Sequence, residues 1–178
     1  MRITGGIAFL LVLLSCLGAY GAVAAPLVFV LPSSTVPSQA DFTVALMLDT
    51  GGDDVLGLHV SIQFDNAIVQ LNRIDPGAWF TFSGVGSYFY DYTHPGTDEI
   101  HFAGSRLGSA TTTGGQVAVM HFTALMGGTS PLDFEICEVR NFLNESLGAD
   151  HSTDDQIVID EAIPSDPTTF GEVKALFR

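Results

Sequence analysis

The segment from Gly57 to Phe80 constrains the fold of this chain more than any other. Apolar and polar residues alternate strictly through its first part. The apolar set is Leu58, Val60, Ile62 and Phe64, and the polar set is His59, Ser61, Gln63 and Asp65. A period of two is typical of a β-strand with one buried face and one solvent face. Asp65-Asn66 interrupts the pattern with turn chemistry, and Asp75-Pro76-Gly77 ends its second part. The segment therefore predicts two strands joined by a turn.

Similar short segments, separated by turn residues, recur along the whole chain. The predicted strands cover residues 27–31, 42–48, 57–64, 68–74, 87–93, 99–103, 116–125, 132–139 and 156–160. No window before the C-terminal tail shows sustained helical periodicity. Short strands at this spacing are typical of sandwiches and jelly rolls. We therefore predict an all-β fold, a nine-stranded antiparallel β-sandwich with jelly-roll topology.

The first 24 residues are predicted to be a signal peptide. An apolar run from Ile7 to Leu14 is too short to span a bilayer, and Ala22-Val23-Ala24 forms an A-x-A cleavage site. Lipidation of Cys16 in a loose lipobox is the alternative. We expect the mature protein to be secreted or held at the cell surface, without membrane insertion, because no later apolar run is long enough for a transmembrane helix.

The charge balance and the cysteine count narrow the function classes. The chain carries 6 basic and 20 acidic residues, a formal charge of −14, which disfavours nucleic acid and anionic membranes as partners. Only two cysteines are present, and Cys16 lies in the signal peptide. Cys137 then has no internal disulfide partner, so the core of the domain must hold by packing.

The domain is expected to span residues 25–163, followed by a linker and a short tail at 164–178. Pro164 and Pro167 mark the linker, and Thr169 with Glu172 fits a helix capping box. An isolated helix of this length is marginal in water. The tail is therefore either frayed or a docking or sorting element.

The order of these segments resembles a cohesin domain. The resemblance rests on residues 41–44 (DFTV), 57–65 (GLHVSIQFD), 71–77, 115–122 (GQVAVMHF), 131–134 (PLDF) and 156–159. Each motif is a pattern of hydrophobic and turn residues, and their order and spacing together carry the likeness. It covers roughly residues 27 to 160, which is nearly the whole mature domain.

The resemblance implies a secreted, non-enzymatic module that docks a calcium-loaded dockerin on one sheet, in an extracellular or cell-surface assembly. In family topology that sheet consists of strands eight, three, six and five. The partner-binding face would here comprise His59, Ser61, Gln63, Tyr90, Tyr92 and His101. Cohesins often carry acidic or amide side chains where this strand has His59 and Ser61. The fold is related to that of cellulose-binding modules, so polysaccharide binding through exposed aromatics is the alternative function.

Other constellations in the sequence do not assign a metal site or a reaction. His59 and His101 would lie on adjacent strands, where they could bind a metal, titrate together or simply be solvated. His121 should face outward from the other sheet. The acidic groups around Asp53 and Asp154 do not match an EF-hand, and neither G-x-S-x-G nor H-E-x-x-H occurs. We therefore expect no cofactor, with calcium only on the partner, and about half of the aromatics between Trp79 and Tyr92 in the core.

Overall fold

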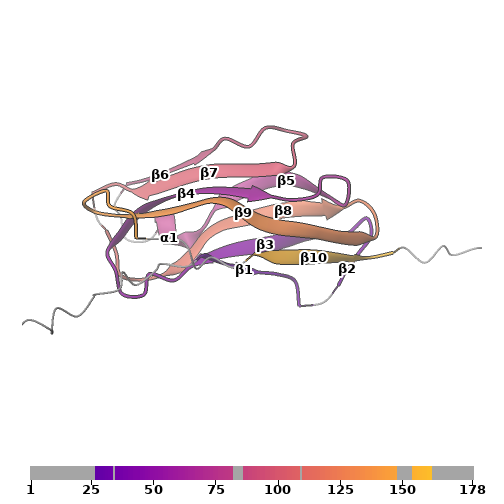
Figure 1. Ribbon diagram of the computed structural model, residues 1–178, viewed down its shortest axis with the longest axis horizontal. Helices are drawn as coiled ribbons and strands as arrows, with labels where there is room; N and C mark the ends of the chain where they lie inside the picture. The colour runs from indigo at the N-terminus through magenta and orange to yellow at the C-terminus, as the bar shows by residue number, and fades with distance from the viewer. Residues whose placement is uncertain (1–26, 34, 82–85, 109, 148–153, 162–178) are drawn as a thin grey trace, which may run out of the picture.

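The computed structural model describes residues 27–33, 35–81, 86–108, 110–147 and 154–161 (Figure 1). The predicted signal peptide, Cys16 and the tail at 164–178 lie outside the described residues. Within the described ranges, no helix is long and apolar enough to cross a membrane.

The described chain folds into strands with one short helix. The elements are β1 (Leu27–Val30), β2 (Val36–Pro37), β3 (Asp41–Leu48), β4 (Val55–Gln63), β5 (Val69–Pro76), α1 (Ala78–Thr81), β6 (Ser87–Asp91), β7 (Glu99–Arg106), β8 (Gly115–Ala124), β9 (Gly128–Asn141) and β10 (Asp155–Asp160). All nine predicted strands are present, which confirms the all-β sandwich.

Two packed sheets make up the sandwich, and their strands run along its long axis (Figure 1). The smaller sheet has the order β1-β3-β8-β5, and the larger has the order β2-β10-β9-β4-β7-β6. The strand pairs are antiparallel except β10 with β2, which is parallel. The run β9-β4-β7-β6 is the sheet that the cohesin resemblance implied.

The structure adds to the predicted elements in several places. Val36–Pro37, which lies in none of the predicted strands, pairs with β10 as a short parallel strand. β9 begins at Gly128 rather than 132 and continues through Pro131. Helix α1, only four residues long, is too short for periodicity to reveal.

The core between the sheets is apolar, and α1 closes it toward one end (Figure 1). Trp79 and Phe80 are 4% and 1% exposed, so both belong to the core. The Trp79 indole Nε1 donates to the Thr113 carbonyl at 3.0 Å, so its polar atom is satisfied. Phe80 lies so close to β7 that a Cβ on Gly104 would stand 2.3 Å from its Cζ. The helix is thereby fixed beneath β7 and β6.

Candidate functional site

The outer face of β9, β4, β7 and β6 carries most of the residues predicted to bind a partner. In antiparallel strands, residues directly opposite one another project on the same side. Ser61 lies opposite His101 and Ile136, and His59 lies opposite Ala103 and Glu138. Tyr90 on β6 lies opposite Ala103. The register therefore assembles one surface from four strands.

A continuous row of rings crosses this surface from its edge to its centre. The row, called the ring row below, consists of Tyr88, Tyr90, Tyr92, His101 and His59. The ring centroids of successive members are 6.1, 4.4, 5.3 and 4.8 Å apart. The three tyrosines are 49%, 47% and 43% exposed, whereas the two histidines are half-buried. Each ring thus supports the next while leaving area for a ligand.

The two histidines of the ring row contact each other directly. The Nε2 atoms of His59 and His101 are 2.5 Å apart, and the imidazole rings lie 24° from parallel. One Nε2 must therefore donate and the other accept, which requires different tautomers in the two neutral rings. The prediction that these residues lie on adjacent strands of one face is confirmed.

Ser61 lies on the same face but is not solvent-exposed, so that part of the prediction is wrong. Its exposure is 0%, because a small side chain is covered between larger neighbours in the register. The hydroxyl donates to Glu99 Oε1 at 2.6 Å. Ser61 therefore supports Glu99, which is exposed, rather than offering itself to a partner.

The remaining predicted residue, Gln63, lies at the end of β4 opposite Glu99 and Asp133 and is half-buried. Farther along β9, Arg140 Nη2 lies 3.0 Å from Glu138 Oε2 in an exposed ion pair. Sequence reasoning did not include Tyr88 or Glu99 in the face. Strand alternation could have found both, since Tyr88 precedes Tyr90 by two residues and Glu99 precedes His101 by two.

His121 lies on β8 in the smaller sheet, as predicted, and cannot join the other histidines. Its Nε2 is 2.9 Å from Asp75 Oδ2, and Arg73 Nε is 3.1 Å from the same carboxylate oxygen. These three side chains form a compact polar cluster on the outer face of the smaller sheet.

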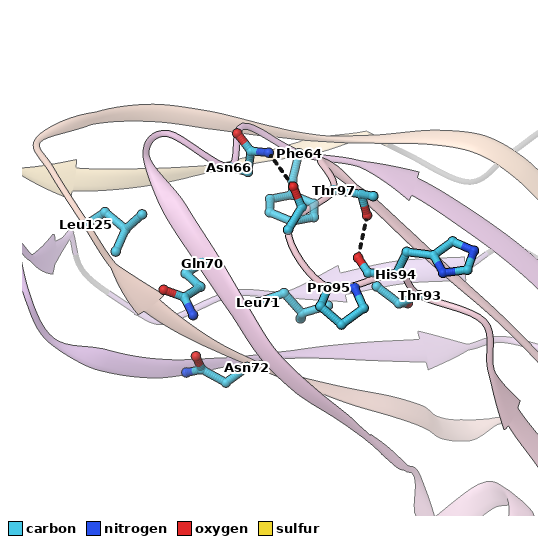
Figure 2. Close-up of a pocket in the computed structure, with 11 residues that line it drawn as sticks. Phe64, Asn66, Gln70, Leu71, Asn72, Thr93, His94, Pro95, Thr97 and Leu125 are labelled. Atoms are coloured by element: carbon cyan, nitrogen blue, oxygen red, sulfur yellow. Dashed lines mark hydrogen bonds between the residues drawn. The ribbon is translucent and has the colours of Figure 1, made fainter.

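A groove lies where β5 approaches the loop after β6. The groove encloses about 580 Å³, and Figure 2 shows residues of β5 on one side and the 93–97 loop on the other. Its polar lining includes Asn66, Gln70, Asn72, Thr93 and Thr97. The Asn66 amide donates to the Gly96 carbonyl at 3.3 Å, and the Thr97 hydroxyl donates to the His94 carbonyl at 2.8 Å (Figure 2). The loop wall is thus held in place.

Two aspartates of the acidic groups accept hydrogen bonds from backbone amides. Asp49 Oδ1 accepts from the Gly51 amide at 3.0 Å, and Asp154 Oδ1 accepts from the Phe134 amide at 2.9 Å. Among the described residues, no three of the types His, Cys, Asp and Glu gather as a metal-binding group.

No protein-family model and no curated protein matches the chain, whereas solved structures do. A non-cellulosomal cohesin from Archaeoglobus fulgidus has a TM-score of 0.63 at 11% identity, covering 83% of this chain and 97% of that one. The seventh ScaB type I cohesin from Pseudobacteroides cellulosolvens gives 0.62 at 14%, covering 80% and 96%. A type I cohesin–dockerin complex from Clostridium thermocellum gives 0.61 at 13%, covering 78% and 96%. The chain thus has a cohesin-like fold, which confirms the resemblance at the level of the fold.

Proposed function

We propose that this domain is a protein-docking module that binds a dockerin-like partner through the outer face of β9, β4, β7 and β6. Support comes from the fold, since neighbours of the same architecture include cohesins solved together with dockerins. The observation that carries the proposal is the ring row, whose exposed tyrosines lie on the sheet implied by the resemblance. Binding is an equilibrium event, and no bond is made or broken.

Tyrosine suits this role because it combines a large rigid apolar area with a hydroxyl that can hydrogen-bond. Interface energy concentrates in a few such aromatic anchors rather than spreading evenly. Tyr90 is central, because its ring contacts both Tyr88 and Tyr92. We expect it to contribute more to affinity than either neighbour.

The charge of the face favours a basic partner. Glu99 and Glu138 project from this surface, with Asp133 near its end, while Arg140 is occupied by Glu138. The whole chain carries a formal charge of −14. Charge complementarity mainly accelerates encounter, so association with a basic partner should slow as salt is added. The predicted signal peptide supports placing this docking outside the cell.

The test is a pull-down with the chain from residue 25 onward against the organism's secreted proteins, with calcium or with chelator. The proposal expects a partner that carries a dockerin-type calcium-loop repeat, is retained only with calcium, and is lost with the Tyr90→Ala variant. A Val28→Ala variant, on the opposite sheet, is the matched control. If the Tyr90→Ala variant retained the partner as strongly as the unmodified chain does, the assignment of the docking face would be wrong.

Polysaccharide binding is the second candidate, and the same exposed tyrosines favour it. Tyr88 and Tyr90 lie within 3° of parallel, an arrangement that can stack on sugar rings. The amides and hydroxyls of the groove in Figure 2 add hydrogen-bonding groups of the kind that sugars use. Co-sedimentation with insoluble polysaccharide that persists in high salt, with no protein partner retained, would favour this function over docking.

A further inference from the structure

We infer that His59 and His101 form a two-histidine site for a borderline divalent transition-metal ion of the class of Zn²⁺, Ni²⁺ or Cu²⁺. This inference goes beyond the proposed docking and does not depend on it. It rests on the two imidazole Nε2 atoms, which come from adjacent strands and face each other at 2.5 Å. Both side chains are half-buried, so the pair is held by its surroundings yet open to solvent.

The backbone register explains why the imidazoles meet. His59 lies opposite Ala103, and His101 lies opposite Ser61, so the two histidines are diagonal neighbours. Across the β4–β7 pair, the residues directly opposite the two histidines are small, which leaves the space between these strands to the two imidazoles. On its other side, His101 is backed by the Tyr92 ring at 5.3 Å. This packing limits the rotamers of His101 and preorganises one side of the pair.

A metal ion requires only a small opening of this arrangement. With Zn–N bonds near 2.0–2.1 Å, two imidazole nitrogens on one ion lie about 2.9 Å apart at a right angle and about 3.3 Å apart at the tetrahedral angle. The pair at 2.5 Å must therefore widen by less than about 1 Å, which small side-chain rotations supply. The donor imidazole must also move its proton from Nε2 to Nδ1, so that both Nε2 lone pairs face the ion.

The ligand chemistry selects the class of ion. Neutral imidazole prefers zinc, copper and nickel, whereas calcium and magnesium prefer oxygen ligands. Within the described ranges no third His, Cys, Asp or Glu completes the set, so water fills the other positions. The carboxylates of Glu99 and Glu138 on the same face favour a cation, and the guanidinium of Arg140 beside Glu138 opposes it. We expect two-point chelation of moderate affinity, not a closed structural site.

The experiment is calorimetric titration of tag-free, chelator-treated protein from residue 25 onward with Zn²⁺ and Ni²⁺, and with Ca²⁺ and Mg²⁺ for comparison. His59→Gln and His101→Gln should each weaken Zn²⁺ binding at least tenfold. His121→Gln, a histidine on β8 of the smaller sheet and outside the pair, should leave it unchanged. The double variant should lose little beyond either single variant, because chelation is already lost with the first histidine.

Imidazole NMR resonances provide a second readout that does not depend on affinity alone. Zn²⁺ should shift the His59 and His101 signals together and leave that of His121, on the other sheet, in place. Amide spectra of each variant without metal check that the fold is kept. Equal Zn²⁺ affinity in His59→Gln, or Ca²⁺ binding as tight as Zn²⁺ binding at the pair, would overturn the inference.

Discussion

The two outward faces of the sandwich follow the same alternation but present different chemistry. On the larger sheet, the ring row links three tyrosines and two histidines through successive ring contacts. On the smaller sheet, Val28 and Val30 are 45% and 51% exposed at the β1 edge, apart from the polar cluster of Arg73, Asp75 and His121. Exposure alone therefore does not distinguish the faces.

The difference lies in where each polar group finds its partner. On the smaller sheet, the Asp75 carboxylate contacts both His121 and Arg73, so charge is neutralised within the cluster. On the larger sheet, His59 and His101 contact each other, and the tyrosine rings remain open to a ligand. A face becomes suited to recognition when its large side chains are aligned by one another and still accessible.

The largest expected effect comes from removing the support beneath only one of the faces. Phe80 is 1% exposed and packs edge-on against Trp79 and Phe89, with centroid distances of 4.9 and 5.5 Å. Phe80→Ala should lower the free energy of unfolding by about 3–5 kcal/mol, because it leaves a cavity under β6 and β7. Urea denaturation measures the loss. As a control, Val28→Ala on the other sheet should change the free energy of unfolding by less than about 0.5 kcal/mol. If Phe80→Ala caused an equally small loss, α1 would not be supporting β6 and β7.

Partner binding gives the next largest contrast. Tyr90 and Val28 have nearly equal exposure, 47% and 45%, on opposite sheets. Tyr90→Ala should lower the affinity for the partner at least tenfold, which is about 1.4 kcal/mol of binding free energy. Val28→Ala should leave this affinity within about twofold of the unmodified chain. Calorimetry with the captured partner measures both. If Val28→Ala has the larger effect, the docking face is on the smaller sheet.

A smaller effect is expected from the part-buried hydrogen bond between Ser61 and Glu99. Ser61 is fully buried and donates to Glu99 Oε1 at 2.6 Å. Ser61→Ala should cost about 1 kcal/mol of unfolding free energy, because it removes a hydrogen bond to a charged acceptor whose exposed carboxylate water can rehydrate. Denaturant unfolding measures the change, and Ser105→Ala, a half-buried serine of β7, serves as control. No loss in Ser61→Ala would mean that solvent replaces this bond freely.

Much of this comparison could be predicted from alternation. The pattern in residues 57–65 assigns His59 to an outer face. The cohesin resemblance, through its strand order, implies that His101 lies on the adjacent strand. Alternation also assigns the inward position of Val60 and the outward position of His121, and the structure agrees. A period of two specifies faces reliably because successive side chains of a strand must point to opposite sides.

Alternation could not predict how far each outer residue is covered. Ser61 is assigned to the correct face, but its burial depends on its neighbours across the strands and on Glu99. The contact between His59 and His101 is diagonal, so it depends on register and rotamers that no local pattern contains. The groove of Figure 2 likewise depends on the loop conformation between Thr93 and Thr97.

The smallest expected effect belongs to the polar cluster on the smaller sheet, and it tests whether visible contacts imply stability. The side chains of Arg73 and Asp75 are 63% and 46% exposed, so solvent screens their attraction. Asp75→Asn should change the free energy of unfolding by less than about 0.5 kcal/mol at moderate salt, because exposed ion pairs gain little over their hydrated ions. Denaturation at low and high salt measures this, and the small difference should shrink further as salt rises. If Asp75→Asn lowered the free energy of unfolding by more than Ser61→Ala does, the polar cluster would be stabilising the smaller sheet. The contrast between the two outer faces would then be wrong.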